Sequence, residues 1–249
     1  MSEDHIIVSR DGAVLEIRFN RPDKKNAITN AMYGVIADAV AGAQSDDAIR
    51  AILFTSNGDF FSAGNDIKDF AAQSMGAFEG PRHVARFLEE VIKAEKPIVA
   101  AVQGHTVGVG TTMLFQCDLV YVADHARLTM PFIDLGVVPE NASSLTVVQR
   151  FGYARAFSLF ALSEPLTGKQ AAEWGLANAA LPAADVEAKA RTAAQALASK
   201  PPQSMRHTKK LMRETQALIA RMNEEGAIFA ERLKSPEAAA AFAAFLQRR

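Results

Sequence analysis

The sequence predicts an α/β protein in which a sheet-containing N-terminal part is followed by a mostly helical C-terminal part. Two observations predict this class. Strand-like and helix-like segments alternate through the first half of the 249 residues, and Ala, Leu, Lys and Glu at helical spacing dominate from about residue 144 onward. The composition, with 49% hydrophobic and 22% charged residues, is that of a globular protein able to bury a sizeable core.

The first elements expected are two short strands joined by a turn. Residues 5–20 hold two β-rich runs around an Asp-Gly dipeptide at residues 11–12, which is typical of a hairpin. A helix follows over residues 29–44 with Thr29 as its N-cap, and a buried strand over residues 49–56.

A second helix is expected over residues 83–96, ending before Pro97, with strands over residues 97–102 and 118–123. This repeated order favours a layered structure with parallel strands. Later helices are expected over residues 167–178, 185–200, 204–225 and 235–247. We divide the chain into a core of residues 1–195 and a helical region of residues 196–249.

Charge and cysteine content exclude several classes of function. The net charge of -1 gives no support for nucleic-acid binding or for attachment to anionic membranes. No window is long and apolar enough to span a bilayer, and residues 1–10 do not resemble a secretory signal, so we expect a cytoplasmic protein. The single cysteine, Cys117, is expected in the core. No spacing suits a metal site.

Two glycine-containing turns each follow an apolar strand-like run. They cover residues 60–67 (FFSAGNDI) and residues 104–110 (GHTVGVG). The first amides of a helix lack intrahelical partners, so two such turns facing each other could direct two N–H groups at one oxygen. Neither turn has the pattern of a dinucleotide site or a P-loop. The residues alone leave open that both are simply tight turns.

A single carboxylate, Glu140, follows the apolar run 135–139 and precedes a row of small residues. One interpretation is a catalytic base in apolar surroundings. The other is a helix start, with Pro139 at the first position and Glu140 interacting with the helix dipole. The residues alone leave both open.

Six motifs occur in an order that resembles the crotonase superfamily of enoyl-CoA hydratases and isomerases. They are RPDKKNAIT, FSAGNDIKDF, KPIVAAVQGHTVGVG, CDLVYVADHARL, PFIDLGVVPENASS and LTGKQAAEWGLAN. The resemblance covers nearly the whole chain and implies a crotonase-like spiral of ββα units with two near-perpendicular sheets and a helical C-terminal trimerisation region. It also implies an acyl-CoA thioester as substrate, with CoA part of that substrate and no separate cofactor, and a homotrimer or dimer of trimers.

The resemblance places two oxyanion-hole amides on Ala63 and Val109. It implies CoA contacts by Lys24, Lys25, Ala27, Ala63, Gly64, Asn65, Asp66, Ile67 and Gly108. Judged by the residues themselves, Asn65 and Asp66 could equally cap a helix, and the two lysines could simply be solvated.

Hydratases of this family use two glutamates, at positions that hold Thr112 and Phe132 in this chain. Neither side chain can polarise a water, so ordinary hydratase activity is not expected. Glu140 instead resembles the acid of the Δ3,Δ2-enoyl-CoA isomerase branch. The hypothesis is that Glu140 removes a proton from C2 of a 3-enoyl-CoA and returns it at C4, while the Ala63 and Val109 amides stabilise the dienolate.

Other hypotheses remain. They are another crotonase-family reaction (hydratase-like, dehalogenase or thioester hydrolase) and a non-catalytic acyl-CoA-binding protein. The dehalogenases use a histidine on the helix before residues 97–102, but His83 lies earlier than expected. Asn141 could bond to Glu140 or cap its turn, and Asp134 could be a second carboxylate or a structural residue. Lys209, Lys210 and Arg213 could lie on an exposed helix face or contact CoA phosphates.

Overall fold

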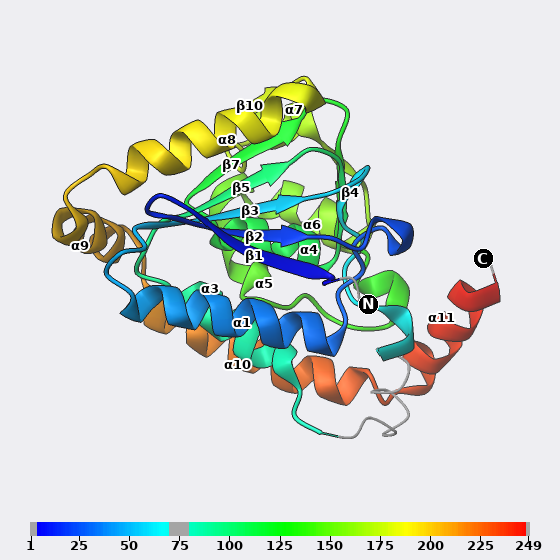
Figure 1. The fold of residues 1–249 in the computed structure, drawn as a ribbon. Helices are drawn as coiled ribbons and strands as arrows, with labels where there is room; N and C mark the ends of the chain where they lie inside the picture. The colour runs from blue at the N-terminus through cyan, green and yellow to red at the C-terminus, as the bar shows by residue number, and fades with distance from the viewer. Residues whose placement is uncertain (1–3, 70–79, 248–249) are drawn as a thin grey trace.

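The computed structural model describes residues 4–69 and 80–247 and contains two mixed sheets (Figure 1). The six-stranded sheet has the order β1 (Ile6–Asp11), β2 (Val14–Phe19), β3 (Ala51–Ser56), β5 (Ile98–Val102), β7 (Leu119–Ala123), β10 (Ala179–Leu181). The four-stranded sheet has the order β4 (Phe60–Ser62), β6 (His105–Val107), β8 (Arg127–Thr129), β9 (Leu166–Thr167). Among the strand pairs of the described residues, only β1–β2 and β8–β9 are antiparallel.

Helices cover the six-stranded sheet and form the C-terminal part. The α-helices are α1 (Asn30–Ser45), α3 (His83–Lys93), α4 (Val109–Thr112), α5 (Ser143–Phe151), α6 (Tyr153–Ala161), α7 (Gly168–Glu173), α8 (Ala183–Ala198), α9 (Pro202–Met212), α10 (Thr215–Arg232) and α11 (Pro236–Gln247). Short 3₁₀ turns are η1 (Pro22–Lys24), η2 (Met113–Gln116) and η3 (Ile133–Leu135). This architecture confirms the predicted α/β class.

The central strands are buried on both faces because helices lie on both sides. Every residue of β3 and β5 is buried. Helix α8 packs along β3, β5 and β7, and in Figure 1 α4, α5 and α6 are seen behind the strands. Small apolar residues at helical spacing, such as Val186, Ala190 and Ala194, let α8 approach the sheet closely and are fully buried.

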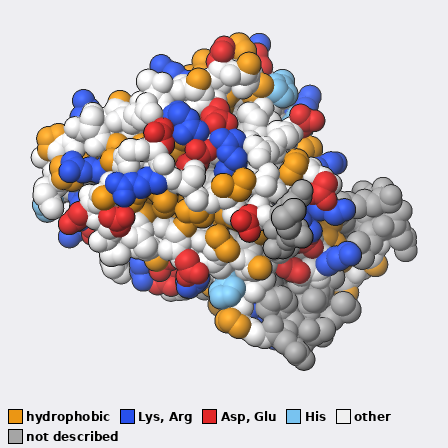
Figure 2. All heavy atoms as spheres, viewed as in Figure 1, with side chains coloured by type: hydrophobic (Ala, Val, Ile, Leu, Met, Phe, Trp, Pro, Cys, Tyr) orange, Lys and Arg blue, Asp and Glu red, His pale blue; other side chains and the backbone are white. Residues whose placement is uncertain are grey.

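Ion pairs fix α8 to β2. Arg191 of α8 bonds to Glu16 of β2 at 2.8 Å, and Arg18 of β2 bonds to Glu187 of α8 at 2.5 Å. Burial acts to raise the pKa of Glu16, but hydrogen bonds from Thr55 and Arg191 outweigh it, so the pKa is lowered. Figure 2 shows acidic and basic side chains intermixed on this face of the molecule.

Most predicted elements are confirmed, with ends shifted by a few residues. The hairpin, the Thr29-capped helix and the three buried strands are present, and Cys117 is buried. The single helix predicted over residues 204–225 is wrong. The chain is extended at Arg213, which separates α9 from α10, because the Arg213 guanidinium turns inward and bonds to Gln116.

The proposed division of the chain falls inside α8, since residues 195 and 196 both belong to that helix. It stays a prediction. Across residues 4–69 and 80–247, no helix is long and apolar enough to cross a bilayer.

Gly104 determines how closely β6 can lie to the start of β4. A Cβ at Gly104 would lie 1.9 Å from the Asp59 carbonyl oxygen, which also accepts the His105 amide at 3.1 Å. Gly104→Ala should therefore lower the free energy of unfolding by about 1–3 kcal/mol, measured by urea denaturation. Gly42→Ala is the control, because a Cβ there meets no atom within 4 Å and alanine favours α1. Equal effects of the two substitutions would contradict this account of the β4–β6 approach.

Candidate active site

The two glycine-containing turns meet because they leave neighbouring parallel strands. Strand β4 pairs with β6, and the turns 63–65 and 108–109 begin at their carboxyl ends. The carboxyl ends of adjacent parallel strands lie at one edge of a sheet, so the segments that follow them start side by side. The two turns thus face each other, an arrangement that the sequence alone left open.

Gly64 makes the closest contact between the turns. Its φ is +82°, a conformation that side chains rarely adopt. A Cβ there would lie 2.8 Å from the Val107 carbonyl oxygen and 3.9 Å from Gly108 Cα. Glycine at this position therefore allows the two backbones to touch.

The amide expected to form the first half of an oxyanion hole is already occupied. The Ala63 N–H donates to the Lys25 carbonyl at 2.9 Å, so the prediction for Ala63 is wrong in this structure. The neighbouring strand bridge explains which amide is available instead. The Ile28 amide donates to the Gly64 carbonyl, and the Ile28 carbonyl accepts the Asp66 amide. The amide of Asn65, which lies between these two residues, therefore points to the opposite side.

The Val109 amide lies at the first position of α4, where a helix offers no internal acceptor. The turn is held by the Gly108 amide, which donates to Thr129, and by the Gly108 carbonyl, which accepts the Thr111 and Thr112 amides. Within the described residues, no backbone acceptor pairs with the Asn65 or Val109 amide. Two donors therefore follow the two strand ends.

A buried tyrosine fixes the Asn65 side chain. The Tyr33 hydroxyl of α1 donates to Asn65 Oδ1 at 2.6 Å, and Tyr33 is 3% exposed. Burial raises the pKa of Tyr33 well above its usual value, with smaller contributions from the negative charges of Glu140 and Asp69. The Tyr33 hydroxyl thus belongs to the same electrostatic environment as Glu140. No motif in the sequence pointed to Tyr33.

Glu140 does not cap the helix that follows it. Helix α5 begins at Ser143. Its N-cap residue is Ala142, whose side chain forms no hydrogen bond with the helix. Pro139 and Glu140 both precede this helix, so the predicted alternative of a first-turn residue is wrong. The Glu140 side chain bonds elsewhere: Thr112 Oγ1 donates to its Oε1 at 2.5 Å.

The Glu140 carboxyl lies in surroundings that favour its neutral form. Burial raises the pKa of Glu140 to about 8, the Thr112 hydrogen bond lowers it, and the negative charge of Glu225 raises it. The side chain is nevertheless only half-buried, so solvent or a ligand can reach it. A carboxyl with a pKa near neutrality can both accept and donate a proton under physiological conditions.

The two positions at which relatives were expected to hold glutamates contain no acid. Thr112 contacts Glu140 directly, and Phe132 is buried with its ring 6.3 Å from that of Phe160. Asp134 is exposed in η3, which favours its structural interpretation. Both predictions for Asn141 are wrong: its carboxamide bonds to no described residue, and its carbonyl accepts Gln116 at 2.7 Å.

Backbone hydrogen bonds join the loop of Lys24, Lys25 and Ala27 to the first turn. Lys25 accepts the Ala63 amide, and Ile28 bridges Gly64 and Asp66. Both lysines are exposed, and the Lys25 Nζ lies 5.1 Å from the Phe60 ring centroid. Ala27 and Ile67 are half-buried. The structure thus brings together the residues expected to contact CoA, while that contact stays a prediction.

The Asp66 carboxylate forms an ion pair and a hydrogen bond with other groups of the protein. It pairs with Arg21 at 2.6 Å and accepts the Lys68 amide at 3.0 Å. Burial acts to raise the pKa of Asp66, but the Arg21 interaction outweighs it and lowers the pKa. These contacts favour the capping alternative for Asp66.

The basic cluster on α9 does not form one exposed face. Lys209 is buried and bonds to Asp118 at 2.7 Å, and Arg213 bonds to Gln116. Only Lys210 of the three is exposed. The interpretation of this cluster as an exposed helix face is therefore wrong for Lys209 and Arg213.

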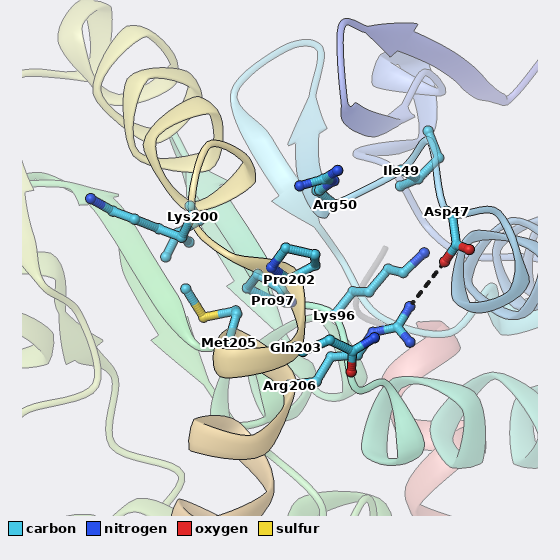
Figure 3. A pocket seen from close by; sticks show the side chains of 11 residues that line it. Asp47, Ile49, Arg50, Lys96, Pro97, Lys200, Pro202, Gln203, Met205 and Arg206 are labelled. Carbon is cyan, nitrogen blue, oxygen red and sulfur yellow. Dashed lines mark ion pairs between the residues drawn. The ribbon is translucent and has the colours of Figure 1, made fainter.

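A pocket of about 240 Å³ lies at the amino-terminal ends of β3 and β5, away from these turns (Figure 3). Arg50, Lys96 and Arg206 contribute to its walls, and Arg206 pairs with Asp47 at 3.8 Å. The Lys96 ammonium is used by the end of α1, donating to the Ala43 and Asp46 carbonyls. We therefore place the candidate active site at the carboxyl ends of β4 and β6, and not in this pocket. No group of three or more potential metal ligands occurs in the described parts of the chain.

Comparisons with known proteins identify the family and the fold. The enoyl-CoA hydratase/isomerase family model matches residues 9–249. Enoyl-CoA delta isomerase 2 of Rattus norvegicus is 36% identical over 250 residues, which are 98% of this chain and 64% of that protein's length. The 2,3-dehydroadipyl-CoA hydratase of Escherichia coli (strain K12) is 29% identical, covering 100% of this chain and 97% of that protein.

The solved structure of Pseudomonas aeruginosa OdaA superposes with a TM-score of 0.94 at 43% identity, covering 99% of this chain and all of that one. A family match over almost the whole sequence and a shared fold lead to one conclusion. The chain belongs to the enoyl-CoA hydratase/isomerase family, within the crotonase superfamily that its motifs resemble.

Proposed function

We propose that this protein is an enoyl-CoA isomerase that converts a 3-enoyl-CoA into the 2-trans-enoyl-CoA. The observation that carries the proposal is a single carboxyl, Glu140, with a pKa of about 8, set beside two strand-end turns that offer unpaired amides. The 36% identity to an enoyl-CoA delta isomerase supports it.

The oxyanion hole is assigned to the Asn65 and Val109 amides, in place of Ala63 and Val109. Removing a proton from C2 of a thioester moves negative charge onto the carbonyl oxygen. Two preorganised N–H donors stabilise that charge by about 3–4 kcal/mol each, judged from oxyanion holes of acyl-transfer enzymes. The Tyr33 hydrogen bond holds Asn65 in place, so its amide needs little reorganisation during the reaction.

Glu140 then acts twice. Its carboxylate takes the C2 proton, the double bond moves as the dienolate forms, and the neutral carboxyl returns the proton at C4. One acid/base suffices because the proton gained in the first step is the one given back. The raised pKa keeps the two protonation states of Glu140 close in energy.

Hydration is the competing reaction, supported by the 29% identical hydratase. It needs a water activated by two acids, and Thr112 and Phe132 occupy the positions expected for them. The substrate is proposed to be an acyl-CoA thioester with no separate cofactor. The homotrimer or dimer of trimers and the cytoplasmic location stay predictions.

The isomerase reaction is tested by ultraviolet absorbance. A 3-enoyl-CoA should gain the absorbance of a conjugated 2-enoyl-CoA, and a 2-enoyl-CoA should lose none by hydration. Glu140→Gln should lower kcat/KM by about 100- to 10,000-fold, because it removes the acid/base. Its melting temperature should not fall. Asp134→Asn, an exposed carboxylate nearby, is the matched control and should keep wild-type activity. Full activity of Glu140→Gln would show that another group is the base.

The oxyanion hole is tested by removing one amide. Val109→Pro deletes the N–H at the first position of α4, where proline is tolerated because no intrahelical bond is lost. We expect kcat to fall by about 100- to 1,000-fold. Val109→Ala keeps the amide and should retain most of the activity. Similar activity in the two variants would remove Val109 from the oxyanion hole.

The pH dependence tests the state of Glu140. The free enzyme needs an ionised Glu140, so kcat/KM should rise with pH and level off above the pKa of about 8. Thr112→Val removes the hydrogen bond that lowers this pKa. The acidic limb of the profile should therefore move to higher pH. A limb near pH 4.5 in the wild-type enzyme would contradict the assigned environment.

A further inference from the structure

A second carboxyl, Glu225 of α10, lies at the start of α5, next to the loop that carries Glu140. Its charge contributes to the raised pKa of Glu140, but its structural role has not been assigned so far. Glu225 is 5% exposed and lies on the buried face of α10, which otherwise contains the apolar residues Leu218 and Met222. Its Oε1 accepts the Ser144 amide at 2.8 Å. Its other oxygen, Oε2, is buried without a hydrogen-bond partner among the described residues. A buried carboxyl with one unpaired oxygen is costly and requires an explanation.

Glu225 supplies the cap that α5 lacks. The first turn of α5 contains no acidic residue, and its N-cap residue Ala142 offers no side-chain acceptor. The amides at the start of a helix carry partial positive charge and favour a nearby anion. Glu225 bonds to the second residue of α5, Ser144, although it lies 81 residues further along the chain.

The loop that leads from Glu140 into α5 has a strained backbone and is held by hydrogen bonds at both of its ends. Asn141 and Ala142 have φ of 65° and 56°, which costs roughly 1–2 kcal/mol for each residue with a side chain. Gln116 donates to the Asn141 carbonyl at 2.7 Å and is itself held by Arg213. Glu225 holds the far end through Ser144. Residues of the C-terminal helical part thus fix the backbone beside Glu140.

We propose that Glu225 is a positioning residue for Glu140, acting through α5 and through its negative charge. Glu225 accepts the amide at the start of α5. The Glu140 side chain is therefore not needed as the cap of this helix and can face the two strand-end turns. The like charge of Glu225 favours the protonated form of Glu140. The inference rests on the proposed function in assigning Glu140 as the acid/base.

The charged and titratable groups around the pair are consistent with this role. Thr112 of α4 bonds to Glu140, and Tyr33 of α1 interacts with its charge. Arg221 of α10 donates to the Ser144 hydroxyl at 3.1 Å and attracts Glu225.

Helix α3 also packs against α10. Its Arg86 pairs with Asp38 and its Lys93 with Glu89. The other titratable side chains of α3, His83 and Glu90, are half-buried. Burial raises the pKa of Glu225, and the Ser144 hydroxyl, followed by the Ser144 and Ala142 amides, acts against that rise. The negative charge of Glu225 in turn raises the pKa of Glu140.

The decisive variant is Glu225→Gln, which keeps an oxygen for the Ser144 amide and removes the charge. Losing a like charge lowers the pKa of Glu140, so the acidic limb of kcat/KM should move to lower pH by roughly half a unit to one unit. This direction is opposite to that expected for Thr112→Val. Glu224→Gln is the matched control, because Glu224 is the exposed neighbour that pairs with Arg221 at 3.0 Å. Its profile should equal that of the wild type.

A titration that does not depend on turnover separates this inference from the proposed function. Carboxyl carbons of ¹³C-labelled glutamate are followed by NMR, with Glu140 assigned from Glu140→Gln. Glu225→Gln should lower the Glu140 midpoint even if no isomerase substrate is found. If Glu225→Gln does not fold, Glu225→Met is used. It removes the same negative charge with a side chain of similar length, so the Glu140 midpoint should again fall.

An unchanged Glu140 midpoint and an unchanged kinetic limb in Glu225→Gln would overturn the inference and leave Glu225 only a helix cap. A shifted midpoint without any isomerase activity would support the inference while removing the proposed reaction.

Discussion

The contact between the carboxyl ends of β4 and β6 is the constraint on which the rest of the site depends. Their parallel pairing starts two turns at one sheet edge, and Gly64 and Gly104 let the two backbones approach closely. Glycine is required at both positions because a Cβ would strike a carbonyl oxygen. From this contact follow two amides without backbone acceptors and a helix, α4, that carries Thr112 to Glu140.

The proposed reaction depends on the protonation state of one carboxyl, Glu140. Burial favours the neutral form of Glu140, Thr112 favours the ionised form, and Glu225 opposes ionisation. The C-terminal helices take part in this balance, since α10 supplies Glu225 and the α9–α10 break supplies Arg213 for Gln116. The sequence indicated the C-terminal helices only as a packing or assembly surface. In the structure they also hold the loop that carries Glu140.

The fold could be predicted from the sequence, and Glu140 could be singled out as the candidate acid/base, but several of its partners could not be predicted. Apolar periodicity and ordered motifs predict the strands, the early helices and the superfamily. The amide assignment failed at Ala63 because the direction of an N–H depends on the Ile28 bridge, which joins residues far apart in the chain. The positive φ that Gly64 permits is the one local signal for a change of direction there. Tyr33, Glu225 and the inward turn of Arg213 depend on tertiary contacts, which no spacing in the sequence encodes.

The most direct test of the central claim is a crystal structure with a bound, non-reacting 3-enoyl-CoA analogue. The account predicts that the thioester oxygen lies about 3 Å from both the Asn65 and Val109 nitrogens. It also predicts that one Glu140 oxygen approaches both C2 and C4 of the acyl chain. An oxygen bound away from these two amides, or an acyl chain out of reach of Glu140, would contradict it.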